Sequence, residues 1–313
     1  MEDRGVLGGA HPAAKLILLA LLALAGIFIT LIIGLLVAIP FFGQDITSLV
    51  LQGEGLDLSE NLNFSRYFQT LSHIGLFVVP ALAFAFLVGR RPLLYLKAWK
   101  RPFWQSLLIS AVIMLAALPL VNYLMEVNLK LDLPPFLEGL EEWMRTAEEG
   151  AEEVTKMFLD VSSWQALLFN LFMIAVIPAI GEEFIFRGIV LRVLKQWFGN
   201  MHLAVWASAL LFSAMHLQFF GFLPRLLLGL LLGYMFVWSR NIWVPVFAHF
   251  FNNAAAVIFY YLHFNGYIKI DIEEVGMGAG TIYYVLVSVV LLIALFAWFR
   301  NYEGRRDKRL SFD

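Results

Sequence analysis

The stretch WQALLFNLFMIAVIPAIGEEFIFR, residues 164–187, decides how the rest of the chain is interpreted. It carries no charged residue up to Gly181, and an apolar run of this length is typical of a helix that spans a membrane. The run then meets Glu182 and Glu183, with Arg187 one helical turn later. Because a charged side chain at the centre of a bilayer costs at least ~2.5 kcal/mol, this cluster predicts a functional site within the membrane.

The composition of the whole chain agrees with a membrane location. Of 313 residues, 61% are hydrophobic and 15% are charged, and the mean hydropathy is +0.78. A soluble protein is usually about 45–50% apolar and about 25% charged. The chain has no cysteine, which excludes disulfides, thiolate nucleophiles and cysteine-ligated metals. The composition therefore predicts a polytopic membrane protein, and nothing in it indicates binding to nucleic acid.

Long apolar runs recur along the sequence. They predict eight membrane-spanning helices, at residues 16–42, 67–88, 104–125, 164–186, 203–219, 222–238, 242–261 and 281–299. No repeat and no soluble domain interrupts them. We therefore expect an all-α polytopic membrane helix bundle, with a single membrane domain over residues 1–313 and a catalytic core at about 160–260.

The connections between these runs alternate in charge. The segments 89–103 and 300–313 are rich in Lys and Arg, whereas 43–61 and 270–274 are acidic. The positive-inside rule then places both termini in the cytoplasm, as an even number of spans requires. In a bacterium the chain would lie in the plasma (inner) membrane. Ser72 and His73, near the start of the second run, are expected at the membrane interface.

Residues 126–162 form an unusually acidic connection on the opposite side. After Pro134 and Pro135, the apolar residues Phe136, Leu140 and Trp143 recur at helical spacing. This pattern predicts an extramembrane amphipathic helix near 135–158. A solvated helix that packs on the bundle is favoured over a dedicated binding element.

The two adjacent glutamates are expected to differ in environment. On a helix, Glu183 and Arg187 are four residues apart and can form an ion pair. Glu182 points about 100° away from Glu183, without a local partner. Two carboxylates in separate environments are how acid and base roles are divided in many active sites. Glu182 is therefore the candidate general base, and Glu183 with Arg187 is the candidate supporting pair.

Two later runs carry further polar residues. In the fifth, Phe212 and His216 are one turn apart, and in the seventh His249 and Asn253 share one face. A histidine with an amide one turn later offers two donors for a developing oxyanion. Alternatively, Glu182, His216 and His249 could bind Zn²⁺. Each element alone also fits a structural role, as a buried ion pair or a hydrogen bond between helices, but the combination is uncommon.

The three patterns resemble the motifs of a known family. GEEFIFRG matches EExxxR, Phe212 to His216 matches FxxxH, and His249 to Asn253 matches HxxxN. Their order and spacing are similar to those of the CPBP family of intramembrane proteases. That family includes the CAAX prenyl endopeptidase and the bacterial Abi proteins linked to bacteriocin processing or immunity. The resemblance covers roughly residues 160–260.

The resemblance implies a set of roles. Glu182 would activate water with help from His216, while His249 and Asn253 would stabilise the oxyanion. Glu183, Arg187 and Phe212 would support the site. The reaction would be hydrolysis of a peptide bond in a membrane-associated or lipidated protein or peptide. No cofactor is expected, although zinc is possible. The partners would be that substrate and the lipid bilayer.

Two readings from other classes stay open at this level. One is a transporter in which Glu182, Glu183 and Arg187 relay protons, although no duplicated half is visible in the sequence. The other is a non-catalytic scaffold. For the protease reading, the three helices must meet at one depth. Either the fifth helix begins later or tilts, or the fourth continues well beyond Arg187, and the amphipathic sequence 188–198 favours the second. The site is expected in the cytoplasmic half of the membrane.

Overall fold

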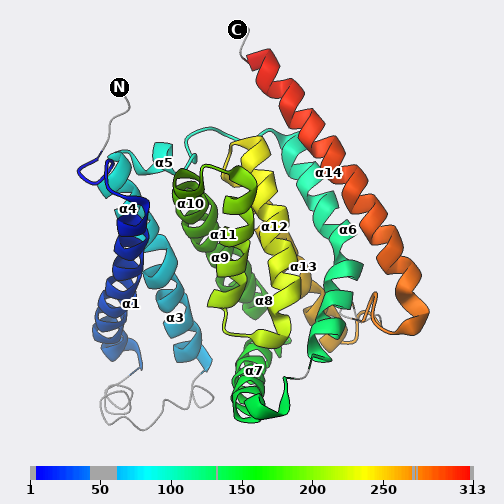
Figure 1. Cartoon of the computed structure of the whole chain (residues 1–313). Coiled ribbons are helices and arrows are strands. Elements are labelled where there is room, and N and C mark those ends of the chain that lie inside the picture. The colour runs from blue at the N-terminus through cyan, green and yellow to red at the C-terminus, as the bar shows by residue number, and fades with distance from the viewer. Residues whose placement is uncertain (1–4, 43–61, 132, 270–271, 273, 311–313) are drawn as a thin grey trace.

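The computed structural model describes residues 5–42, 62–131, 133–269, 272 and 274–310. Helices and short connections make up this part of the chain, and no strand occurs in it. The long helices run roughly side by side, with α7 set across one end of the bundle (Figure 1). The predicted all-α helix bundle is therefore confirmed.

Eight helical rods correspond to the eight predicted runs. Two of them combine several segments without a break: Leu62–Gly89 contains α3, a π-helical turn and α4, and Trp164–Phe198 contains α8, α9 and α10 with two π-helical turns between them. The other rods are α1 (Pro12–Phe42), α6 (Trp104–Leu129), α11 (Met201–Met215), α12 (Phe222–Ser239), α13 (Trp243–Phe264) and α14 (Ile282–Leu310). Two further helices, α5 (Pro92–Tyr95) and α7 (Glu138–Leu159), lie outside these rods.

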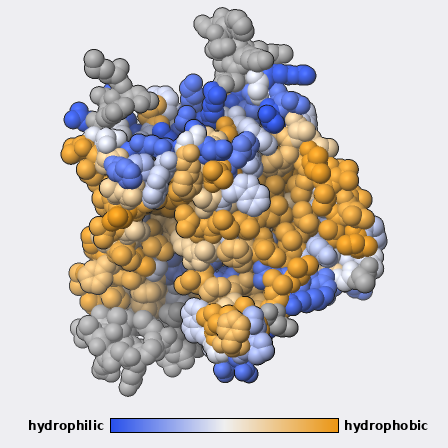
Figure 2. Space-filling model, in the orientation of Figure 1, coloured by the Kyte–Doolittle hydropathy of each residue, from blue (hydrophilic) through white to orange (hydrophobic). Residues whose placement is uncertain are grey.

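Six of the rods are long and apolar enough to cross a membrane: Pro12–Phe42, Leu62–Gly89, Trp104–Leu129, Trp164–Phe198, Phe219–Ser239 and Ile282–Arg306. The fifth predicted span is a shorter apolar helix of 15 residues, α11. The seventh, α13, is long but is not among the six, and it carries His249, Asn252 and Asn253. On the face shown in Figure 2, orange apolar side chains fill the middle of the molecule, and blue polar side chains gather above them, toward the end that holds α5. The chain is a multi-pass membrane protein.

Local sequence explains where these rods begin and end. Asn200 caps α11, because its side chain accepts hydrogen bonds from the backbone N–H groups of His202 and Leu203 at 2.8 and 3.2 Å. Gly199 ends α10 in the left-handed conformation, at φ 69°. The tight link of Gly199 and Asn200 therefore turns the chain from α10 directly into α11.

The first described residues and the end of α14 lie at the same end of the bundle (Figure 1). The basic connection between α4 and α6 is at this end too. Its backbone is tied to the turn between α12 and α13, because Asn241 Nδ2 donates to the carbonyl of Lys100 at 2.8 Å. Which side of the membrane this end faces stays a prediction. The acidic segment 43–61 and most of the 270–274 charges lie outside the described residues.

The predicted amphipathic helix is present as α7, over Glu138–Leu159, at the opposite end of the bundle (Figure 1). Its C-terminal end is anchored, because the Phe158 carbonyl accepts from Asn170 Nδ2 at 2.6 Å. Its N-terminal half packs on the 3-10 turn Phe219–Gly221 that precedes α12, where the rings of Trp143 and Phe219 lie 5.6 Å apart. The packed, partly solvated helix expected from the sequence is what the structure contains.

Candidate active site

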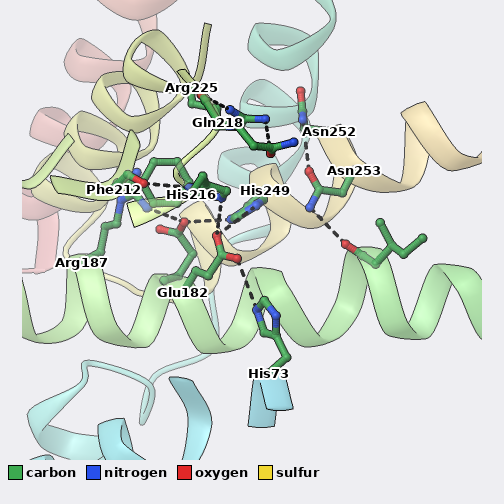
Figure 3. Close-up of polar contacts among 12 residues, drawn as sticks. His73, Glu182, Arg187, Phe212, His216, Gln218, Arg225, His249, Asn252 and Asn253 are labelled. Atoms are coloured by element: carbon green, nitrogen blue, oxygen red, sulfur yellow. Dashed lines mark hydrogen bonds and ion pairs between the residues drawn. The ribbon is translucent and has the colours of Figure 1, made fainter. Parts of the chain in front are cut away.

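Four rods meet at Glu182 (Figure 3). The helix Trp164–Phe198 is 35 residues long, so Glu182 lies near its middle and not at an end. His73 comes from Leu62–Gly89, His216 follows the last residue of α11, and His249 lies on the first half of α13. The depth problem raised by the sequence is solved by the extension of the fourth helix beyond Arg187 as α10.

Glu183 is the centre of a buried ion-pair network. Its Oε1 lies 2.7 Å from Arg187 Nη1 and 3.0 Å from His249 Nδ1. Arg187 Nη2 donates to the carbonyl of Gly229 at 2.9 Å, and its guanidinium lies over the ring of Phe212, 4.7 Å from the centroid. Glu183 and Arg187 are 0% and 1% exposed. The predicted pairing of these two residues is therefore present, and it also holds the His249 ring.

Glu182 has a different environment, as expected from its place on the helix. Its Oε1 lies 3.3 Å from His73 Nε2. Its Oε2 lies 4.0 Å from His216 Nε2 and 3.9 Å from His249 Nε2. These two distances are too long for direct hydrogen bonds. Oε2 is buried and accepts no hydrogen bond from any described residue.

In His216 and His249 the second nitrogen of the imidazole is already engaged. His216 Nδ1 lies 2.8 Å from the Phe212 carbonyl oxygen. A carbonyl oxygen only accepts, so His216 Nδ1 carries the proton. His249 Nδ1 is bound to the Glu183 carboxylate in the same way. Both Nε2 atoms are therefore the ones turned toward Glu182 Oε2, and Phe212 positions His216 through its backbone.

Asn253 is hydrogen-bonded to the π-helical turn Leu171–Val176 of the helix that carries Glu182. Pro178 has no N–H, so the carbonyl of Ile174, four residues before it, lacks its usual helical donor. Asn253 Nδ2 donates to that carbonyl at 3.2 Å, and Asn253 Oδ1 accepts from Asn252 Nδ2 at 3.2 Å. The amide has a second hydrogen that this bond leaves free. The sequence analysis placed Asn253 at the site but missed this link to Pro178.

His73 is a site residue that the sequence analysis placed elsewhere. It was expected at the membrane interface, but the helix begins at Leu62 and His73 lies well inside it, in contact with Glu182. Its ring stacks on Phe77, with centroids 4.5 Å apart. Gly181 permits this approach, because a Cβ there would lie 2.7 Å from Phe77 Cβ. An imidazole in an apolar run was the signal that could have identified it.

A cavity of about 220 Å³ opens beside these groups. Glu182, His216, His249, Asn252 and Asn253 line it, together with Phe212, Met114, Leu228, Leu232 and Arg225. The guanidinium of Arg225 is fixed on the wall, because it donates to the carbonyl and the side-chain Oε1 of Gln218 at 3.0 and 2.5 Å. The sequence analysis missed Arg225, although an arginine within an apolar run carries the same cost as the glutamates.

The helix α7 approaches the cavity wall on the Arg225 side. The Arg145 guanidinium lies 4.7 Å from the centroid of the Phe220 ring. Glu148 faces the same turn, where burial raises the pKa of its carboxyl and the charge of Arg225 opposes that rise. The acidic helix therefore places the Glu148 carboxyl near Arg225 on the cavity wall.

The geometry does not fit zinc bound directly by Glu182, His216 and His249. Ligand atoms about 2.0–2.1 Å from a tetrahedral ion lie roughly 3.3 Å from one another. The corresponding distances here are 3.9 and 4.0 Å. Within the described residues, no group of three or more His, Asp or Glu side chains is arranged to hold a metal ion.

Comparison with known proteins identifies the region that carries these residues. Residues 164–255 match the family model described as type II CAAX prenyl endopeptidase Rce1-like. This part of the chain resembles the Rce1-like family. The match contains all seven motif residues from Glu182 to Asn253 and leaves out His73. It confirms the resemblance that the three motifs predicted.

A curated relative extends the comparison. The chain is 28% identical over 89 residues to the uncharacterized protein YpbD of Bacillus subtilis (strain 168). The aligned part is 27% of this chain and 42% of the relative, so it spans less than half of that protein. No solved structure matches significantly. The Rce1-like family is a family of membrane proteases.

Proposed function

We propose that the chain is an intramembrane endopeptidase that hydrolyses a peptide bond of a membrane-associated or lipidated substrate, with Glu182 activating the water. The observation that carries the proposal is the buried Glu182 Oε2, which faces His216 Nε2 and His249 Nε2 at 4.0 and 3.9 Å across a cavity. Polar atoms at such distances are commonly joined by a bridging water. One water could contact all three atoms.

In the proposed reaction, Glu182 Oε2 takes a proton from that water as its oxygen attacks the scissile carbonyl carbon. His216 orients the water through Nε2, because its Nδ1 is held by Phe212. The oxyanion is stabilised by the free amide hydrogen of Asn253 and by His249 in its doubly protonated form, in which Nδ1–H stays on Glu183 and Nε2–H faces the cavity. Glu182 then returns the proton to the amine as the C–N bond breaks. A single donor to an oxyanion is typically worth ~3–4 kcal/mol.

The remaining residues support this arrangement. Glu183 and Arg187 hold the His249 ring, so Nε2 is the atom that it presents to the cavity. His73 holds the second oxygen of Glu182. The site uses no side chain as a covalent nucleophile in this scheme. A proton relay or a scaffold would not need histidines and an amide gathered around one cavity, and this favours the protease over both.

The substrate can be sought directly in membranes. Cells that express the wild-type protein and cells that express Glu182→Gln are compared for membrane-protein fragments with new C-termini. Gln keeps the volume of Glu182 and removes the base, and Glu152→Gln is the control for an exposed carboxylate on α7. Fragments should be present with wild type and Glu152→Gln and absent with Glu182→Gln. Identical fragment sets in all three would contradict the proposal.

A further inference from the structure

A second, separate feature lies where the connection between α4 and α6 meets α13. An apolar groove of about 500 Å³ lies against residues 98–102 of this connection. Its walls are Leu107 of α6 and seven apolar or aromatic side chains of α13 and of the helix that carries Glu182, namely Val176, Ala179, Ile180, Trp243, Val246, Phe247 and Phe250. None of the candidate catalytic residues lines it.

The charged side chains that line the apolar groove are Lys100 and Arg101. Both are exposed, and no acidic side chain lines the groove in the described part of the chain. The groove therefore combines a long apolar surface with two cations at its border. This is the pattern of a site for an amphiphile with an anionic head.

A basic cavity of about 300 Å³ lies against the same connection and shares Trp99, Lys100, Arg101 and Pro102 with the groove. Lys97, Arg240 and Arg306 also line it, and no acidic side chain does so among the described residues. Arg306 is paired with the buried Glu303 at 2.5 Å, which reduces its contribution. Among the described residues, Lys100 and Arg101 are the charged side chains that line both the apolar groove and the basic cavity, so they contribute most to the attraction of an anion.

The position in the bundle suits a membrane lipid. The connection carries several Lys and Arg residues, and Trp99 next to Lys100 and Arg101 is 73% exposed, as side chains at a membrane interface commonly are. Clustered cations between helices attract anionic phospholipid head groups. The acyl chain of such a lipid would be matched by the apolar groove, whose volume is in the range of sites for ligands of moderate size.

We infer that the apolar groove and the cations Lys100 and Arg101 form a binding site for an anionic phospholipid of the surrounding membrane. The phosphate is bound by these two side chains, and one acyl chain lies in the groove against α13. A neutral phospholipid fits the groove equally well but lacks the net charge that the two cations attract. Selectivity for anionic lipid is therefore the defining property of the site.

The lipid site is connected to the start of α13. The Ala98 carbonyl accepts from Trp243 Nε1 at 2.9 Å, and the Lys100 carbonyl accepts from Asn241 Nδ2 at 2.8 Å. The groove residues Val246 and Phe250 flank His249 in sequence on the same helix. A lipid that fills the groove therefore packs on the helix that carries His249 and Asn253, and it should stabilise that helix against unfolding.

The test is lipid retention by the full chain. The protein is reconstituted in phosphatidylcholine nanodiscs with a minor fraction of phosphatidylglycerol, released into detergent, and examined by native mass spectrometry for bound lipid. Wild type should retain phosphatidylglycerol in preference to phosphatidylcholine. In Lys100→Gln/Arg101→Gln this preference should fall roughly tenfold or more. Arg90→Gln/Arg300→Gln, which removes two exposed charges outside both spaces, should keep it.

A third variant separates the groove from the charges. Leu107→Trp narrows the apolar groove and leaves Lys100 and Arg101 in place. It should also lose retained phosphatidylglycerol, provided that its unfolding midpoint shows that it is folded. The inference is overturned if wild type shows no lipid preference, if both double variants lose it equally, or if Leu107→Trp retains lipid at the wild-type level. Complete displacement of the lipid by inorganic phosphate would also overturn it, because the site would then bind anions in general and not a phospholipid.

Discussion

His249 Nδ1 lies 3.0 Å from Glu183 Oε1, and the same oxygen lies 2.7 Å from Arg187 Nη1. One carboxylate oxygen thus joins the predicted supporting pair to a predicted oxyanion residue on another helix. This contact fixes which nitrogen of His249 faces Glu182. All three side chains are almost fully buried, and the effect of removing one charge depends on that burial.

Replacing Glu183 by Gln should lower the free energy of unfolding, although Gln has nearly the same shape as Glu. The substitution leaves the buried Arg187 charge without its partner, and breaking one side of a buried ion pair typically costs about 3–5 kcal/mol. The midpoint of unfolding in detergent measures the effect. Glu152→Gln, which removes one side of an exposed pair with Lys156, should change stability by roughly 1 kcal/mol or less. Equal effects of the two variants would show that the network is not structural.

The sequence placed seven residues at the site, and the reason lies in their spacing. Glu183 and Arg187, Phe212 and His216, and His249 and Asn253 are each four apart, so local helix geometry already sets their mutual orientation. What spacing alone leaves open is how separate helices approach each other. His73 reaches Glu182 only because Gly181 lets two helices pack closely, and this depends on tertiary contact.

Helix lengths were harder to predict than helix positions. The apolar run of the fourth helix ends near Phe186, but the amphipathic sequence 188–198 predicted that the helix continues, and α10 does reach Phe198, with Val193 and Leu194 buried in the bundle. The helix α11 ends earlier than the predicted span 203–219. Its last residue is Met215, and His216 is the residue that follows it. In both helices, tertiary contacts and capping determined the boundary, and average hydropathy did not.

His73→Phe should lower the rate constant of peptide cleavage by roughly 10-fold or more without unfolding the protein. Phe keeps the stacking on Phe77 but removes the contact with Glu182 Oε1, so the carboxylate is held less firmly. Kinetics with a substrate found in membranes measure this, with kcat and KM separated. An unchanged kcat would assign His73 a purely structural role.

Asn253→Ala should lose both activity and stability. The loss of an oxyanion donor predicts a decrease in kcat of about 10²–10³-fold. The Ile174 carbonyl also loses its donor, which costs about 1–3 kcal/mol if it stays buried.

The second substitution Pro178→Ala separates these two effects. Alanine at 178 supplies the N–H that the Ile174 carbonyl lacks, so Asn253→Ala/Pro178→Ala should recover stability but not kcat. Recovery of both together would show that Asn253 acts only by satisfying that carbonyl.

His216→Gln should reduce cleavage by roughly 10²–10⁴-fold with little change in KM, because the proposed role of Nε2 is to orient the water in the transition state. The control is His202→Gln, an imidazole at the start of α11 that bonds to Tyr234 away from the cavity. Cleavage by His202→Gln should match wild type. A rise in KM alone for His216→Gln would place His216 in substrate binding.

Removal of divalent metals tests the zinc alternative. Because the distances from Glu182 Oε2 to the two histidines exceed those between ligands of one zinc ion, chelation should leave the cleavage rate unchanged. The assay is done on protein dialysed against a strong chelator, with and without added Zn²⁺. Loss of activity that Zn²⁺ restores would select a zinc protease using Glu182, His216 and His249.

The central claim is that Glu182 activates the water. The most direct measurement is the rate of peptide-bond cleavage by purified, metal-depleted wild type and Glu182→Gln, at saturating substrate and with equal unfolding midpoints. The account predicts that Gln, which matches the carboxylate in shape but is not a base, lowers kcat by roughly 10²–10⁴-fold. Cleavage by folded Glu182→Gln at the wild-type rate would contradict it.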